Sequence, residues 1–303
     1  MALLTVGVPV YNGEKHITRA LDSLANQTNQ DFLVLVSNNA STDKTPELIS
    51  RHKGLRGLRV FDQETNIGPM RNFFFLLDRC KTPFFMWLAH DDYLSENYIE
   101  EMINTLKSED AVLAVPKTCL FREGEPQLQE LSAIHNQKIM HFPDTSAKTS
   151  EMYSRYPVAY WFYGVWKTNV IKSCWHLLDD LWPSLKEENY PAHGDVLMIY
   201  MASLHGFFAQ NLKASHFYQL PPKNSGKQKV DHWARLQRSL LIAKTVFAST
   251  LKIKQLDASA SFSRTLRMIV AYRLTAKLVK PRHLLLRTIR WPFDFLYRSL
   301  LNN

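Results

Sequence analysis

The most constraining feature of this chain is the regular alternation of apolar and amphipathic segments over residues 1–116. Short apolar runs are typical of buried strands and cover residues 3–10, 31–36, 58–61, 84–88 and 111–115. Between them, apolar residues recur at helical spacing in residues 14–25, 44–52, 68–77 and 96–107. Continuously apolar strands separated by such helices indicate a parallel sheet covered on both faces. The predicted fold class is therefore α/β, with a mostly parallel sheet flanked by helices.

Charge divides the chain into two parts. Residues 1–225 hold 21 Lys+Arg and 25 Asp+Glu, a net charge of −4, whereas residues 226–303 hold 16 and 3, a net charge of +13. The 46% of hydrophobic residues excludes a mostly disordered chain. We expect an α/β domain over 1–225, with halves at 1–116 and 117–225, followed by a basic helical region at 226–303.

Several classes of protein lose support. Three cysteines without a CxxC pair predict neither a disulfide framework nor a zinc module, and favour a reducing, cytoplasmic setting. We expect no signal peptide, and no run of 18 apolar residues predicts a transmembrane helix. No GxGxxG follows the first strand and no GxxxxGK[ST] occurs, which disfavours dinucleotide oxidoreductases and P-loop proteins.

The basic region has three interpretations. Over residues 282–301 an apolar stripe and an Arg-rich stripe run at helical spacing, with Trp291 and Phe295 at their border. Such helices suit an anionic membrane surface, which we favour. Packing on the first domain or on a second protomer, in a homo-oligomer, is the main alternative. Nucleic acid is disfavoured because no recognition motif is present.

Two loops carry polar groups at predicted strand ends. Asp91 and Asp92 directly follow the fourth strand, where ligands of parallel sheets bind. Adjacent carboxylates there suit a hard divalent cation, although an Asp that caps the next helix explains them equally well. The first loop, Pro9–Glu14, offers an aromatic ring and an amide to a flat base, or is simply an Asn-Gly turn.

Residues 3–116 contain, in order, the segments VGVPVYNGEKHITRALDSLANQTNQDFLVLVSNNASTDKT, NIGPMRN and WLAHDDY. Their order and spacing resemble family 2 glycosyltransferases. The resemblance continues more weakly to about residue 225, with the stretch ENYPAHGDVLM in this weaker part. The resemblance implies a Rossmann-like GT-A fold. It also implies a nucleotide-sugar site that contains Pro9, Tyr11, Asn12, Glu14, Asn38, Asn39, Asn66, Gly68, Arg71 and Asp91. Asn38 stands where the family usually has an acidic residue, and Ala89 where it has the first Asp of D-x-D-D.

The same resemblance implies the catalytic groups. Asp92 would ligate Mg²⁺ or Mn²⁺, and the diphosphate and water would complete the coordination of the ion. Asp195 falls where the family has its base, although an Asp here is also a helix cap. Residues expected on the acceptor side are His193, Trp161, Tyr163 and Gly164; the aromatic ones are as common in a core.

The resemblance implies an inverting, metal-dependent glycosyltransferase. Its donor would be a nucleoside-diphosphate sugar, with UDP- or dTDP-sugars favoured. Its acceptor would be a saccharide hydroxyl, lipid-linked, in lipopolysaccharide, capsule or other polysaccharide synthesis at the cytoplasmic face of the inner membrane. The alternative is a non-catalytic sugar-nucleotide-binding or scaffold protein of the same fold.

Overall fold

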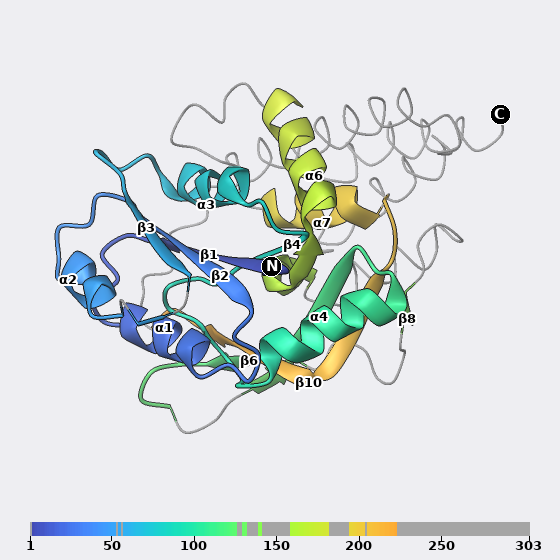
Figure 1. The fold of residues 1–303 in the computed structure, drawn as a ribbon, viewed down its shortest axis with the longest axis horizontal. Coiled ribbons are helices and arrows are strands. Elements are labelled where there is room, and N and C mark those ends of the chain that lie inside the picture. The colour runs from blue at the N-terminus through green and yellow to red at the C-terminus, as the bar shows by residue number, and fades with distance from the viewer. Residues whose placement is uncertain are drawn as a thin grey trace, which may run out of the picture.

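The computed structural model describes residues 2–52, 54–55, 57–125, 129–131, 139–140, 158–181, 194–203 and 205–222. These residues form one sheet with helices on both faces (Figure 1). The predicted basic region at 226–303 lies outside the described residues, so its helices stay a prediction. Within the described residues, no helix is both long and apolar enough to cross a membrane.

Four parallel strands form the first part of the sheet. β1 (Leu4–Val10) lies between β2 (Phe32–Asn38) and β4 (Phe84–Trp87), and β3 (Leu58–Asp62) lies outside β2. The helices that connect them are α1 (Ile17–Ala25), α2 (Thr45–Ser50) and α3 (Pro69–Arg79). Every residue of β1 is buried, as expected of a central strand covered on both faces. The predicted α/β class is confirmed.

The second part of the sheet is mixed. After α4 (Tyr98–Glu109) come β6 (Leu113–Phe121), β9 (Val165–Lys167) and β10 (Phe208–Gln219), with short strands β5 (Tyr93–Leu94), β7 (Gln129–Leu131) and β8 (Ile139–Met140). The order is β3-β2-β1-β4-β9-β6-β10-β5. β9 is antiparallel to β4 and β6, whereas β10 is parallel to β6. Antiparallel pairs need no crossover helix, so the helix–strand alternation could not reveal them.

The two faces of the sheet have separate hydrophobic cores. On one face lie α3, α6 (Thr168–Leu181) and α7 (Gly194–Ser203), and on the other lie α1, α2 and α4 (Figure 1). The first core also receives the 3₁₀ helix η1 (Val158–Tyr163). This core holds Trp87, Trp161, Trp166 and Trp175. The sheet between the two cores fixes where the carboxyl ends of β1, β2 and β4 emerge.

Candidate functional site

The carboxyl ends of β1, β2 and β3 stand in one row. Val10 is paired in register with Asn38, and Asn38 with Asp62. The loops that leave these three residues therefore start side by side. Ligands of open α/β sheets bind at this edge, so the predicted nucleotide-sugar residues are brought to one place.

The first loop, after β1, is hydrogen-bonded to the second loop, after β2, through the backbone and the side-chain amide of Asn12. The backbone N–H of Asn12 donates to Oγ of Ser41 at 2.9 Å, and Oδ1 of Asn12 accepts from the backbone N–H of Thr42 at 2.9 Å. Asn12 has φ +49°, a conformation that Asn tolerates better than most residues. Tyr11, next to it, is 44% exposed. Asn12 therefore shapes the loop, whereas the Tyr11 ring is open to a ligand.

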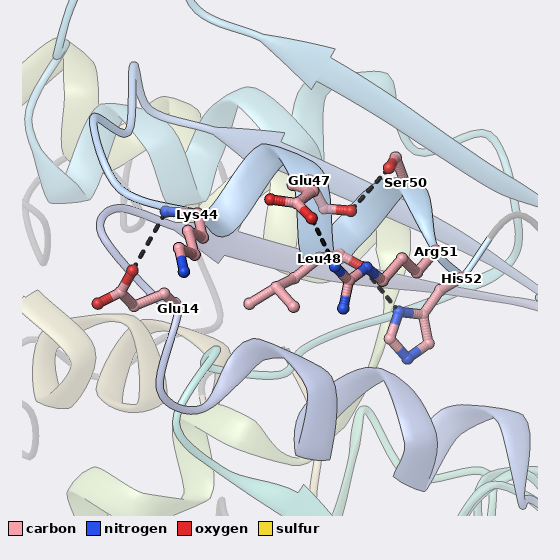
Figure 2. A network of polar contacts seen from close by, with 7 residues as sticks. All are labelled: Glu14, Lys44, Glu47, Leu48, Ser50, Arg51 and His52. Atoms are coloured by element: carbon pink, nitrogen blue, oxygen red, sulfur yellow. Dashed lines mark hydrogen bonds and ion pairs between the residues drawn. The ribbon is translucent and has the colours of Figure 1, made fainter.

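Glu14 and Asp43 close the contact between the two loops. The backbone N–H of Glu14 donates to Oδ2 of Asp43 at 3.0 Å, and the Glu14 carboxylate accepts from the backbone N–H of Lys44 at 3.2 Å (Figure 2). Burial tends to raise the pKa of Asp43. Hydrogen bonds from the Thr45 side chain and from the backbone of Glu14 and Thr45 outweigh burial and leave this pKa below its ordinary value.

Two buried amides tie the end of β2 to its neighbours. Oδ1 of Asn38 accepts from the backbone N–H of Ser41 at 3.1 Å, and its Nδ2 donates to Oδ1 of Asp62 at 2.8 Å. Asn39 accepts from the backbone N–H of Ile67 at 2.8 Å and donates to Oδ1 of Asn66 at 2.9 Å. We call the side chains of Asn12, Glu14, Asn38, Asn39 and Asp43 the loop network. The amide groups of Asn38 and Asn39 are thus both engaged within the protein.

The remaining residues of the predicted nucleotide site lie around the loop network. Pro9 is buried in β1, opposite Ser37. Gly68 has φ +82° and precedes α3, and Arg71 is exposed in the first turn of that helix. Asp62 was missed by the sequence reasoning. Its place at the end of a strand, paired in register with Asn38, is the signal that could have found it.

Asp91 and Asp92 lie in the turn between β4, which ends at Trp87, and β5, which begins at Tyr93. The next helix, α4, begins at Tyr98 with Asn97 as its N-cap residue, so neither carboxylate caps it. Asp92 is 1% exposed and Asp91 is half-buried. Burial and the negative charge of Asp92 raise the pKa of Asp91, whereas burial lowers the pKa of the neighbouring His90.

The first loop packs closely on this turn through Gly13. A Cβ atom at Gly13 would stand 2.7 Å from Cδ2 of His90 and 2.6 Å from Cγ2 of Val10. Real Cβ atoms do not approach other atoms so closely. Glycine at position 13 therefore allows the first loop and the Asp91–Asp92 turn to touch.

Arg19 and Gln219 connect the same turn to the end of β10. Nη2 of Arg19 donates to the carbonyl oxygen of Asp91 at 2.7 Å and to the side-chain oxygen of Gln219. The Arg19 guanidinium carbon lies 5.1 Å from the Tyr93 ring centroid and 4.8 Å from that of Phe121, in cation–π range. Sequence reasoning missed Arg19, because one Arg on an amphipathic helix is typical of a solvated surface.

Both carboxylate oxygens of Asp92 contact residues of β10. Its Oδ1 accepts from the backbone N–H of Gln219 at 2.9 Å, and its Oδ2 lies 3.2 Å from Nε2 of His216. The ring of Tyr163 stacks on the His216 imidazole with 5.4 Å between ring centroids and 24° between planes. We call Arg19, Asp91, Asp92, His216 and Gln219 the carboxylate junction. It joins the turn after β4 to the far part of the sheet.

The predicted acceptor-side residues have different environments. Trp161 is 2% exposed in the hydrophobic core, so its ring faces are covered by protein, contrary to a role in stacking on a sugar. Tyr163 lies beside the carboxylate junction, and burial raises the pKa of its phenol well above the ordinary value. Gly164 follows it, where a Cβ would meet the carbonyl oxygen of Ala114 at 2.4 Å. His193 lies outside the described residues.

Asp195 lies in the first turn of α7 and is half-buried. Burial is the main cause that raises the pKa values of Tyr163 and Tyr218. Nearby negative charges, which include Asp92, Asp91 and Asp195, raise these pKa values further. The structure thus brings Asp195 within electrostatic range of the tyrosines that border the carboxylate junction. Its place in the first helical turn also suits the helix dipole.

Whether the site fits a divalent cation depends on which carboxylate oxygen atoms could act as its ligands. Among the described residues no group of three or more His, Cys, Asp or Glu side chains gathers as a ready metal site. Oδ2 of Asp92 is nevertheless buried without a hydrogen bond from any described residue. Carboxylate oxygens are preferred ligands of Mg²⁺ and Mn²⁺, so this atom fits a cation that takes its other ligands from a nucleotide and water.

Comparison with known proteins gives one family model and several relatives. Residues 5–162 match the model of glycosyl transferase family 2. The teichoic acid poly(glycerol phosphate) polymerase of Staphylococcus epidermidis is 29% identical over 136 residues, which are 44% of this chain and 19% of that protein. The poly(ribitol-phosphate) beta-N-acetylglucosaminyltransferase TarS of Staphylococcus aureus is 33% identical over 104 residues, 33% of this chain and 18% of that protein.

Solved structures resemble the chain over a greater length. The crystal structure of S. aureus TarS residues 1–349 in complex with UDP-GlcNAc has a TM-score of 0.65 at 19% identity, and the match covers 90% of this chain and 71% of that one. The sequence matches to TarS and to the polymerase each span about a fifth of those relatives.

Proposed function

Because the chain belongs to glycosyl transferase family 2, we propose that it transfers a sugar from a nucleoside-diphosphate sugar to a hydroxyl of a saccharide acceptor, with inversion. The likeness to the TarS structures confirms the expected GT-A architecture. The observation that supports the proposal is the arrangement of three parts. Tyr11 directly follows β1 and is exposed, and the Asp91–Asp92 turn follows the neighbouring strand β4. Asp195 lies in the first turn of α7, and its negative charge acts with those of Asp91 and Asp92 on the phenol of Tyr163.

The donor site in this proposal is built on the loop network. The Tyr11 ring would stack on the base, and the loops held by Asn12 and Glu14 would border it. UDP- or dTDP-sugars are the proposed donors. TarS, a structural relative, was solved with UDP-GlcNAc and with UDP, which supports this choice.

The chemistry in this proposal is a single displacement. Asp195 would take the proton of the acceptor hydroxyl as that oxygen attacks the anomeric carbon, and the bond to the diphosphate breaks on the opposite side. Asp92 would hold Mg²⁺ or Mn²⁺ through Oδ2, with Asp91 beside it. Such a cation, when bound, neutralises the charge that develops on the leaving diphosphate.

The acceptor in this proposal is a lipid-linked saccharide of a surface polysaccharide. Two relatives are named as a teichoic acid poly(glycerol phosphate) polymerase and a poly(ribitol-phosphate) beta-N-acetylglucosaminyltransferase, and these names support a polymeric acceptor. The net charge of +13 in residues 226–303 would hold the protein on the anionic, cytoplasmic face of the membrane.

A transfer assay with a panel of UDP-, dTDP- and GDP-sugars tests the proposal. Asp195→Asn should lower kcat by about 10² to 10⁴-fold, the usual contribution of a general base, and leave the donor KM nearly unchanged. The matched control is Asp179→Asn, an exposed carboxylate on α6, which should keep full activity. Undiminished turnover in Asp195→Asn would remove this residue from the mechanism. Donor binding without transfer from any sugar would favour the non-catalytic alternative.

A further inference from the structure

Two exposed groups stand at the row of strand ends, one on each side of it. The Tyr11 ring, directly after β1, is 44% exposed, and Asp62 ends β3 as an exposed carboxylate. Val10, Asn38 and Asp62 are paired in register across two strand spacings of about 4.8 Å. The backbones of Val10 and Asp62 are therefore about 10 Å apart, a span that a tyrosine side chain and a planar base together bridge.

The amides between these two groups are occupied. Asn38 is 4% exposed, and its Oδ1 accepts from the backbone N–H of Ser41 at 3.1 Å. Asn39 is 2% exposed, and its Oδ1 accepts from the backbone N–H of Ile67 at 2.8 Å. Each buried amide oxygen thus already serves the protein, so an acceptor for a ligand has to come from another side chain.

Asp62 has a free acceptor atom. Its Oδ1 accepts from Nδ2 of the buried Asn38 at 2.8 Å, which fixes the orientation of the carboxylate. Its Oδ2 has no hydrogen bond or ion pair within the part of the chain that the structure describes. A carboxylate held by one oxygen at the edge where ligands of parallel sheets bind therefore offers its second oxygen to a ligand.

We propose that Asp62 determines which base the donor carries, because its Oδ2 accepts a hydrogen bond from the ring N–H of a uracil or thymine that stacks on Tyr11. The inference rests on the proposed function, whose donor is a nucleoside-diphosphate sugar. An ionised carboxylate is purely an acceptor, and uracil and thymine both have a hydrogen atom on N3. A hydrogen bond to a charged oxygen is about twice as strong as a neutral one.

The same carboxylate excludes cytosine by repulsion. Cytosine has a lone pair on N3, where uracil has a hydrogen atom, so the carboxylate would face a second acceptor. Specificity of this kind comes as much from the unmatched group as from the matched one. We therefore expect UDP to bind more tightly than CDP, although the ribose and the diphosphate of the two ligands are identical.

A purely structural role for Asp62 makes a different demand. To hold Nδ2 of Asn38, the protein needs a single acceptor oxygen at position 62, which an asparagine supplies equally well. In Asp62→Asn, the buried Nδ2 of Asn38 keeps the new amide oxygen turned toward it, so the new NH₂ group takes the place of Oδ2. The variant therefore changes the group that faces the ligand and preserves the contact within the protein.

Isothermal titration calorimetry of the full chain with UDP and with CDP, in buffer that contains Mn²⁺, tests the proposal. Asp62→Asn should weaken UDP binding by at least about tenfold, the usual effect of losing one hydrogen bond to a charged group. It should weaken CDP binding less or strengthen it, because an NH₂ group donates to the lone pair of cytosine N3. The matched control is Glu64→Gln, an exposed carboxylate two residues further on, which should leave both affinities unchanged. An unchanged ratio of UDP to CDP affinity in Asp62→Asn would overturn the proposal.

A second measurement on the unmodified chain covers the case in which Asp62→Asn does not fold. UDP methylated at N3 has no ring N–H and should bind at least about tenfold more weakly than UDP. Equal binding of UDP and its N3-methyl derivative would contradict the proposal, as would tighter binding of CDP than of UDP. UDP binding that depends on Asp62 in a protein without transferase activity would remove the proposed function and keep the base assignment. Sugar transfer with an unchanged ratio in Asp62→Asn would do the reverse.

Discussion

The loop network and the carboxylate junction differ in how far the hydrogen bonds of their polar side chains are made within the protein. In the loop network, Asn38, Asn39 and Asp43 meet backbone N–H groups or other side chains at both ends of each polar group. In the carboxylate junction, Oδ2 of Asp92, Nε of Arg19 and both nitrogens of His216 are buried without a hydrogen bond from a described residue. The first region is complete by itself, whereas in the second Oδ2 of Asp92 and Nε2 of His216 face each other at 3.2 Å without a hydrogen bond.

The comparison also explains where chemistry can occur. A side chain whose hydrogen bonds are all made within the protein gives a loop its shape but has little left for a substrate. An unmet group in a buried setting interacts strongly with any ion or polar ligand that reaches it. The loop network therefore fixes the shape of its loops, and the carboxylate junction keeps buried polar groups whose hydrogen bonds are not all made within the described residues.

The largest expected effect on stability is that of Asn39→Ala. This change leaves the backbone N–H of Ile67 and Oδ1 of Asn66 without the buried amide that they now contact. The free energy of unfolding should fall by about 2–4 kcal/mol, since two hydrogen bonds are lost and one donor loses its partner. Urea denaturation measures this loss. Asn104→Ala, on the exposed side of α4, is the matched control and should change stability by less than about 0.5 kcal/mol.

Arg19→Met tests the other region and should affect activity more than stability. The methionine can still lie against the Tyr93 and Phe121 rings but cannot donate to the Asp91 carbonyl or to Gln219. We expect a loss of about 1–2 kcal/mol in stability, and a fall in kcat that exceeds the loss of folded protein at assay temperature. Urea denaturation and transfer assays on the same sample give both numbers. Arg59→Met, on exposed β3, is the control. A fall in activity that merely follows unfolding would make Arg19 a structural residue only.

The smallest expected effect concerns pH and Asp43. Its pKa lies below the ordinary value of 3.8, so the folded protein favours the carboxylate. The stabilisation is present above pH 3.8 and is lost as pH falls through the lower, folded-state pKa. Thermal unfolding between pH 3 and pH 6 should therefore show a loss of Tm on the acid side that is smaller in Asp43→Asn. Equal acid slopes in both proteins would show that the loop network does not depend on this charge.

Much of the loop network could be predicted from the sequence because each of its loops directly follows an apolar run that is recognisable by itself. Buried parallel strands read as continuous apolar runs, and each polar loop follows directly from a strand end. The second region depends on pairings between residues far apart in the chain, such as Asp92 with Gln219 and Arg19 with Asp91. No periodicity encodes these pairings. The burial of Trp161 is of the same kind, since an aromatic run looks alike in a core and at a sugar site.

The separation of the two cores has a spectroscopic consequence. The tryptophans of the described residues all lie in the core beneath α3, α6 and α7, and the core beneath α1, α2 and α4 has none. With Trp182, Trp233 and Trp291 replaced by Phe, indole fluorescence would report on one layer of the molecule. Far-ultraviolet circular dichroism would follow both layers. Comparing the two signals during unfolding would then reveal whether the layers separate or melt together.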